Sequence, residues 1–184
     1  MRGLFINKQN VGIVLGLFLC SVSILGGALY VFHTKHVRVT IPDIDAVAHS
    51  PSGYVTLDGS QFTLSSHAAR YTIVTSWASW CPTCASNLSV LSTLKQQKEN
   101  SDIAIFAINR KEQKDLARVY MKDAHLPESI VYVFDTDDHF FSTIGGYAMP
   151  ETVVYDRTGK AVAHVRDALT IQSAHDLFES FARE

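Results

Sequence analysis

Cys81 and Cys84 are the residues of this chain whose type and spacing point most directly to chemistry. They stand in the run Trp80-Cys81-Pro82-Thr83-Cys84, so one helical turn can bring their sulfurs together. A thiolate at such a site attacks a disulfide, and a second thiol nearby resolves the mixed disulfide that forms. The motif therefore predicts disulfide exchange in which Cys81 attacks and Cys84 resolves.

Other uses of a cysteine pair need residues that this sequence lacks. A zinc site needs a second ligand pair, and the eight scattered histidines supply none at the required spacing. A c-type haem site needs histidine directly after the second cysteine, where Ala85 stands. A structural disulfide remains an alternative, although closing so short a loop adds little stability through the unfolded state. We expect no metal and no cofactor besides the redox-active disulfide Cys81–Cys84.

A strand followed by a helix must position this motif. Residues 71–76 form a β-branched run that predicts a buried strand, and leucines at helical spacing predict a helix from Pro82 to about Glu99. Cys81 then lies at a helix N-terminus, where unpaired N–H groups and the macrodipole favour an anion. The pKa of its thiol should therefore fall below the free value of about 8.5.

The rest of the soluble part alternates strands with helices, which predicts an α/β fold whose last strand pair is antiparallel. Strands are expected at residues 54–57, 61–64, 103–108, 130–134, 152–155 and 161–165, and helices at 113–122, 138–144 and 171–182.

An uncharged apolar segment precedes this domain. Residues 11–32 could form a helix about 33 Å long, which is enough to cross a hydrocarbon core of about 30 Å. We expect a cytoplasmic N-terminus at 1–10, a transmembrane anchor at 11–32 with Cys20 buried in it, a linker at 33–52 and one domain at 53–184. A cleaved signal peptide ending near Ala28 is the alternative. The net charge of −2 gives no reason to expect nucleic acid as a partner.

The stretch from Ser76 to Cys84 resembles the active site of membrane-anchored thioredoxin-like proteins of the TlpA/ResA type. The resemblance covers about residues 54–182. It implies a thioredoxin fold with an inserted strand–helix element near residues 113–134, preceded by one transmembrane helix. It also implies a cis-proline that faces the cysteines, at Met149-Pro150. Trp80, Met149 and Pro150 are thus the expected substrate-binding residues, and an extended partner segment would add to the backbone there.

A narrower resemblance concerns the run from Gly145 to Thr152, which looks like the matching loop of CcmG/DsbE, the thiol–disulfide oxidoreductases of cytochrome c maturation. Asn109 and Lys111 also resemble that branch. The resemblance implies an exported enzyme, anchored in the inner membrane with its domain on the periplasmic side. Protein thiols and disulfides would be its substrates, apocytochrome c among the candidates, and a transmembrane protein its electron donor. A general reductase or oxidase, and a non-catalytic thioredoxin-like binding or chaperone module, remain alternatives.

The chain departs from the family in its acids. Asn87 stands where the family usually has glutamate after the second cysteine, and Thr75 stands where thioredoxins bury an acid. Glu151 follows Pro150 directly and is the expected proton acceptor for Cys84, with Asp167 as a further acid of uncertain alignment.

Overall fold

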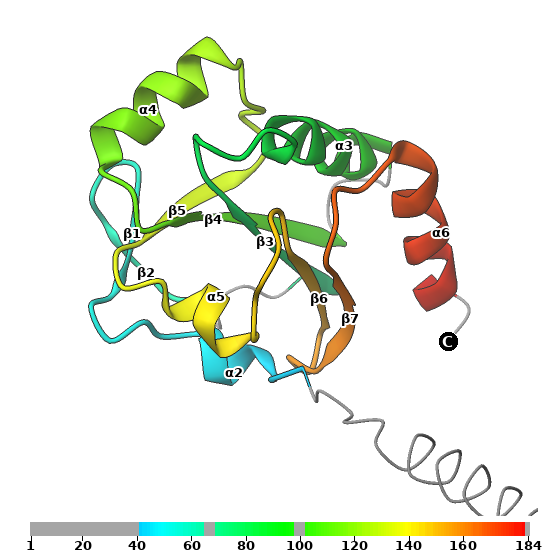
Figure 1. Cartoon of the computed structure of the whole chain (residues 1–184). Coiled ribbons are helices and arrows are strands. Elements are labelled where there is room, and N and C mark those ends of the chain that lie inside the picture. The colour runs from blue at the N-terminus through cyan, green and yellow to red at the C-terminus, as the bar shows by residue number, and fades with distance from the viewer. Residues whose placement is uncertain (1–40, 65–68, 98–101, 183–184) are drawn as a thin grey trace, which may run out of the picture. The chain divides into compact units, whose positions relative to one another are not determined.

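The computed structural model describes residues 41–64, 69–97 and 102–182. A seven-stranded sheet runs through this part in the order β2-β1-β5-β4-β3-β6-β7 (Figure 1). Strands β3, β4 and β5 are parallel, whereas β6 pairs antiparallel with β3 and with β7. The strands span Tyr54–Thr56 (β1), Gln61–Phe62 (β2), Tyr71–Trp77 (β3), Ile103–Arg110 (β4), Val131–Asp135 (β5), Thr152–Asp156 (β6) and Ala161–Val165 (β7).

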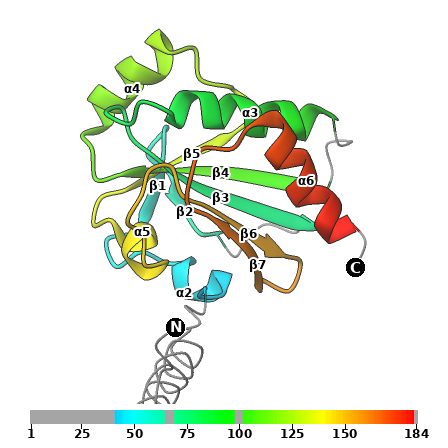
Figure 2. The ribbon, with the colours of Figure 1, turned by 45° about the vertical axis from the view of Figure 1, so that its right-hand side comes forward.

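Helices cover both faces of the sheet (Figure 2). Three lie on the face that carries the cysteines, and they span Cys84–Gln97 (α3), Lys114–Asp123 (α4) and Ile171–Ala182 (α6). The two short helices on the opposite face span Ile44–Val47 (α2) and His139–Thr143 (α5). We call the sheet face covered by α3, α4 and α6 the α3 face, and the face covered by α2 and α5 the α5 face.

The central strand β3 contributes to both cores because its side chains alternate between the two faces. Ile73 and Trp77 pack in the core of the α3 face, whereas Val74 packs in the core of the α5 face. Every residue of β3 after Tyr71 is buried, as expected for a strand covered on both sides. The end of this strand is where the cysteine motif begins.

The structure confirms each expected strand and helix of the soluble part, with shifts at their ends. The first two strands are shorter than expected, and β4 continues to Arg110. Helix α3 begins at Cys84 rather than at Pro82, because Pro82 and Thr83 form a turn. Helix α4 and strand β5 occupy the place expected for the inserted element.

The expected linker at 33–52 is partly wrong. Residues from Ile41 onward belong to the folded unit, and α2 buries Ile44 and Val47 in the core of the α5 face. A four-residue helix is too short to show a periodic pattern, so no local signal predicts it. The expected anchor at 11–32 lies outside the described residues. Among the described helices, none combines the length and the apolar character that a membrane span requires.

Candidate redox site

A disulfide joins Cys81 and Cys84 at the start of α3, and their Cα atoms lie 5.5 Å apart. The loop that carries it leaves β3 at Trp77 and turns back at Ala78, whose carbonyl accepts the Cys81 N–H at 3.1 Å. The exposed fractions of Cys81 and Cys84 are only 1% and 0%. Trp80 in the same loop is 59% exposed, so it borders the disulfide as an open apolar surface.

The backbone around the disulfide is that of a helix N-terminus. The Cys84 N–H points to the Cys81 carbonyl at 3.4 Å, and the Asn87 N–H donates to the Thr83 carbonyl at 3.0 Å. Cys81 therefore precedes the first turn of a helix of 14 residues. A helix N-terminus favours a negative charge, so this position suits a thiolate, the form of cysteine that attacks a disulfide.

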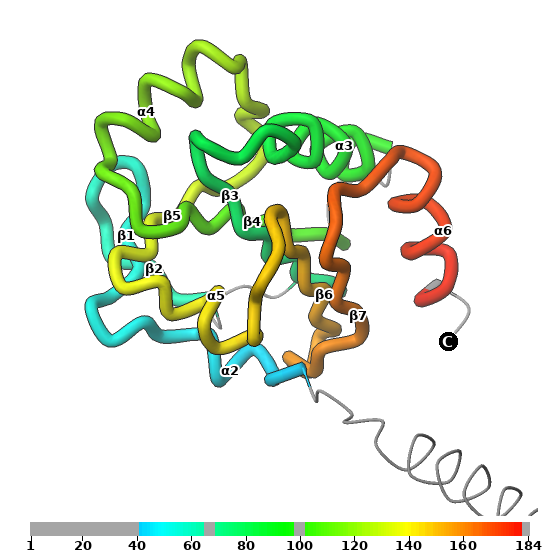
Figure 3. The backbone as a smooth tube through the Cα atoms, viewed as in Figure 1, coloured from blue at the N-terminus to red at the C-terminus, as the bar shows by residue number. Residues whose placement is uncertain are grey.

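The loop before β6 runs between α5 and β6, and Figure 3 shows its path. Its Met149–Pro150 peptide bond is cis, as the resemblance implied, and Pro150 is buried. Met149 packs against the core cluster that contains both cysteines. The Ser76 N–H donates to the Glu151 carbonyl at 2.8 Å, and the Ser76 hydroxyl accepts the Glu151 N–H at 2.9 Å. Two loops far apart in sequence thus meet at the end of β3.

A neutral polar network fills the positions where the family and the thioredoxins place acids. The Asn87 side chain is fully buried and donates from Nδ2 to the Thr75 hydroxyl at 3.2 Å. Its Oδ1 accepts the Leu169 N–H at 2.9 Å. The Thr75 hydroxyl also bonds the Thr152 hydroxyl at 2.8 Å. No member of this network is a carboxylate, so it holds Asn87 firmly but has no group that readily takes a proton.

The Glu151 carboxylate is fully buried on the opposite face of the sheet. The side chain of Thr152 bonds Thr75 on the α3 face, so that of its neighbour Glu151 points to the α5 face. Glu151 Oε1 accepts the N–H groups of Tyr147 at 2.6 Å and Ala148 at 2.9 Å. Glu151 Oε2 bonds His164 Nε2 at 2.6 Å. This arrangement favours a role in holding the cis-proline loop over proton transfer at the cysteines.

Two basic side chains complete the surroundings of Glu151. Burial lowers the pKa of His164, against the opposing effect of its hydrogen bond to Glu151. An imidazole that carries a proton on Nε2 donates this hydrogen bond to Glu151. Arg166 lies 3.8 Å from Glu151 Oε2 and stacks over the ring of Tyr147 at 4.7 Å. Asp167, the other acid considered, is exposed.

Glu112 is the functional candidate that the sequence did not reveal. It lies in the loop between β4 and α4, and its carboxylate reaches the cysteine loop. Glu112 Oε2 accepts the Ser79 N–H at 2.9 Å and Asn109 Nδ2 at 2.7 Å, while Oε1 accepts the Ser79 hydroxyl at 2.5 Å. Sequence reasoning passed over it because a single acid in a loop carries no motif.

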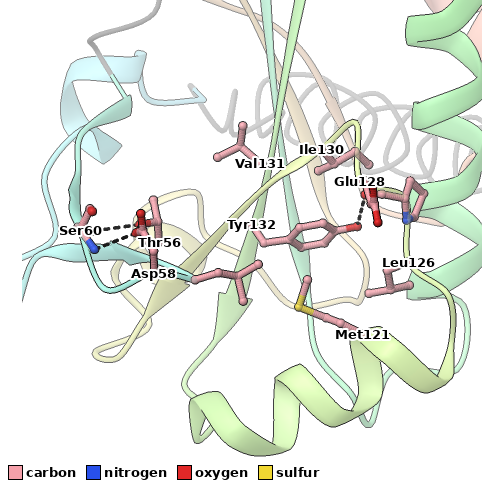
Figure 4. Close-up of a pocket in the computed structure, with 11 residues that line it drawn as sticks. Thr56, Asp58, Ser60, Met121, Leu126, Glu128, Ile130, Val131 and Tyr132 are labelled. Atoms are coloured by element: carbon pink, nitrogen blue, oxygen red, sulfur yellow. Dashed lines mark hydrogen bonds between the residues drawn. The ribbon is translucent and has the colours of Figure 1, made fainter.

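Other parts of the described structure lack the groups for redox chemistry. A pocket of about 540 Å³ opens between the β1–β2 turn, the end of α4 and the start of β5 (Figure 4). Leu57, Met121 and Tyr132 are among its lining residues, and no cysteine is. No group of three His, Cys, Asp or Glu side chains in residues 41–64, 69–97 and 102–182 could hold a metal ion.

Comparison with known proteins settles the family. A family model described as Redoxin matches residues 37–172, which is most of the chain. The chain belongs to the Redoxin family. A Redoxin-family fold with a disulfide at a helix N-terminus makes this protein a thioredoxin-like oxidoreductase. No curated protein sequence matches it.

Solved structures show the same fold at low sequence identity. A candidate thiol:disulfide interchange protein DsbE from Chlorobium tepidum is 18% identical, with a TM-score of 0.63 over 78% of this chain and 94% of that one. A secreted Mycobacterium tuberculosis disulfide oxidoreductase homologous to E. coli DsbE is 17% identical, with a TM-score of 0.58 over 70% and 94%. A thioredoxin-like protein from Aeropyrum pernix is 13% identical, with a TM-score of 0.59 over 87% and 99%.

Proposed function

We propose that this Redoxin-family protein is a membrane-anchored thiol–disulfide oxidoreductase of the DsbE/CcmG type that reduces disulfides of partner proteins outside the cytoplasm. The observation that carries the proposal is the Cys81–Cys84 disulfide at the start of α3, beside the Met149–Pro150 loop. Both the attacking group and a backbone edge for a partner segment are thus supplied at one place.

The reaction is a transfer of two electrons from the dithiol to a partner disulfide. The Cys81 thiolate attacks one partner sulfur, breaks the partner disulfide and releases the other partner sulfur as a thiolate. Cys84 then loses its proton and attacks Cys81 Sγ, which frees the second partner sulfur. The protein is left oxidised, as in the structure, and a transmembrane electron donor returns it to the dithiol state.

The proposed setting of this reaction and its candidate substrate rest on sequence. The apolar residues 11–32 support an anchor in the cytoplasmic membrane, with the domain on the periplasmic side. The Cys-Pro-Thr-Cys motif and the Pro-Glu-Thr run at 150–152 support the disulfide of oxidised apocytochrome c as a substrate, because both resemble the cytochrome c maturation branch. DsbE-like proteins among the similar structures agree with that branch.

The experiment that tests the proposal captures partners as mixed disulfides. Cys84→Ser cannot resolve the first intermediate, so in cells it should accumulate covalent complexes that dithiothreitol releases. Cys81→Ser is the matched control and should accumulate none. Complexes with apocytochrome c support the maturation role, whereas varied exported proteins indicate a general reductase. Absence of any thiol exchange by the wild-type protein would leave a binding module instead.

The reduction potential decides between a reductase and an oxidase. Proteins of this fold range from about −270 mV for thioredoxin to about −120 mV for DsbA. We expect equilibration with glutathione to place Cys81–Cys84 at the reducing end of that range. A value near the DsbA end would contradict the proposed direction of electron flow.

The anchor has a separate test. The full-length protein should remain with membranes after a high-salt wash and retain residues 1–32. A soluble mature protein that starts near Leu29 would show that the segment is a cleaved signal peptide.

A further inference from the structure

A carboxylate ties the cysteine loop to the neighbouring strand beyond the point where their ladder ends. Strands β3 and β4 pair as far as Trp77 and Asn109. Past these residues the ladder between the two segments ends. Glu112 bridges the segments by accepting hydrogen bonds from Ser79 after β3 and from Asn109 in β4. Ser79 stands two residues before Cys81, so the bridge acts on the segment that presents the attacking sulfur.

Three features make this bridge more than a surface contact. It accepts both the N–H and the hydroxyl of Ser79, which fixes the backbone as well as the side chain. Asn109, which donates the third bond, is 1% exposed, so the bridge is attached to a buried residue of β4. All three donors are neutral, so none of them neutralises the Glu112 carboxylate.

We propose that Glu112 is a positioning residue for Cys81, which fixes the approach of its sulfur to a partner disulfide and, through its charge, tunes how readily the Cys81 thiolate forms. The inference rests on the proposed thiol exchange. Thr75 and Asn87 occupy the usual acid positions, and neither is a carboxylate. Glu112 places a carboxylate at the edge of the site instead.

The hydrogen bonds and the charge of Glu112 should have opposite effects on attack by Cys81. Anchoring the loop speeds attack, because a reacting atom held near its productive position avoids much of the entropic cost of orientation. The negative charge opposes formation of a second negative charge nearby, and so raises the thiol pKa of Cys81 in the reduced protein. Substitutions that remove the charge alone, or the charge and the bonds together, separate the two.

Glu112→Gln removes the charge and can keep every bond. Its Oε1 can accept from Ser79 and Asn109, and its Nε2 can donate to the Ser79 hydroxyl. We expect the Cys81 thiol pKa, followed by thiolate absorbance of the reduced full-length protein, to fall by about half a unit. The equilibrium with glutathione should shift by about threefold toward the dithiol form.

Glu112→Ala removes the charge and the bonds. We expect its single-turnover attack on a model disulfide to be about tenfold slower than that of Glu112→Gln at the same thiolate fraction. Ser79→Ala removes one bond and should show part of this loss. If Glu112→Ala does not fold, the pair Glu112→Gln and Ser79→Ala still carries the test.

Asp115→Asn is the matched control, since it removes one negative charge from α4 at a side chain that is 94% exposed and pairs with Arg118. It should leave the thiol pKa, the glutathione equilibrium and the attack rate at wild-type values. If the Glu112 variants match Asp115→Asn in all three measurements, or lower only the melting temperature, the inference is wrong. A wild-type protein without thiol exchange would instead refute the proposed function.

Discussion

The two faces of the central sheet bury different kinds of polar side chain. On the α3 face, next to the disulfide, the network of Thr75, Asn87 and Thr152 is neutral. On the α5 face lie Asp135 and Glu151, the only carboxylates among the buried residues that the structure describes. Among the described residues, the sheet therefore separates the buried acids from the disulfide.

The difference follows from what each face offers a buried charge. A carboxylate taken out of water needs donors for its oxygens, or it becomes protonated. Backbone N–H groups supply them on the α5 face, from Tyr147 and Ala148 in a loop to Glu151 and from Phe140 in the first turn of α5 to Asp135. Near Asn87 one backbone N–H, that of Leu169, reaches the side chain. The α3 face thus suits an amide better than an acid.

The largest expected effect comes from removing the acid that holds the cis-proline loop. Glu151→Ala leaves two backbone N–H groups and His164 without their acceptor in a buried site. We expect it to lose about 2–4 kcal/mol of unfolding free energy, measured by urea denaturation. Glu151→Gln keeps an acceptor and should lose less than half of this. Equal losses for both would show that the charge, rather than the hydrogen bonds, stabilises the loop.

Placing an acid on the redox face should have the next largest effect. Asn87→Asp keeps an acceptor for the Leu169 N–H and can accept from the Thr75 hydroxyl. Because it introduces a carboxylate one turn from Cys84, we expect the resolving step to accelerate by about 10- to 100-fold. Stopped-flow reduction of a model disulfide measures this step. A rate equal to that of wild type would mean that water accepts the proton equally well.

Asp135 should make the stability of the protein depend on pH. Burial raises its pKa to about 6, and its Oδ1 has no hydrogen-bond partner apart from the proton it can share with Asp137. Its ordinary pKa is about 3.8, so the native state binds the proton more tightly and loses stability as the pH rises from about 4 to about 6.

Asp135→Asn should abolish this loss, since it cannot ionise. We expect the variant and wild type to be about equally stable at pH 4, and the variant to be more stable by about 1–3 kcal/mol at pH 8. Hydrogen bonding lowers the pKa of Asp137. The contribution of Asp137 to the free energy of unfolding is therefore lost only as the pH falls below about 4. A stability difference that does not change between pH 4 and pH 8 would contradict the assignment.

The smallest effect concerns the hydroxyls beneath the disulfide. Thr75→Val preserves the shape of the side chain but leaves Asn87 Nδ2 and the Thr152 hydroxyl without their shared partner. Thermal unfolding should report a loss of about 1–2 kcal/mol. Thr72→Val on the same strand is the control, because it makes the same replacement of a buried threonine by valine outside the network. A loss no greater than in that control would make the network energetically unimportant.

Local pattern predicted most of the fold and the centre of the site. Alternation of strands and helices, together with the Cys-Pro-Thr-Cys motif, predicted the α/β sheet and the place of Cys81. The resemblance added the cis bond at Pro150. Strand order and the short helix α2 depend on contacts between distant segments, and no local pattern encodes them.

The roles of the acids could not be predicted for a related reason. Glu151 is next to the cis-proline in sequence, but the pleat of β6 turns its side chain away from the face that carries the cysteines. Glu112 is 28 residues beyond Cys84 in the chain and still contacts the cysteine loop, because β3 and β4 are neighbours. Closeness in sequence therefore does not show which face of the sheet the Glu151 side chain enters. Distance in sequence likewise does not reveal the contact of Glu112 with the cysteine loop.

The resolving rate of Glu151→Gln tests the separation of the two faces most directly. The mixed disulfide between Cys81 and a model thiol is formed, and its resolution by Cys84 is followed by stopped flow from pH 5 to pH 9. If the sheet isolates Glu151 from the cysteines, the rate and its pH profile should match those of wild type within about twofold, while Asn87→Asp accelerates the same step. A rate for Glu151→Gln that falls 10-fold or more, with a pH profile that loses one titration, would show that Glu151 accepts the Cys84 proton after all.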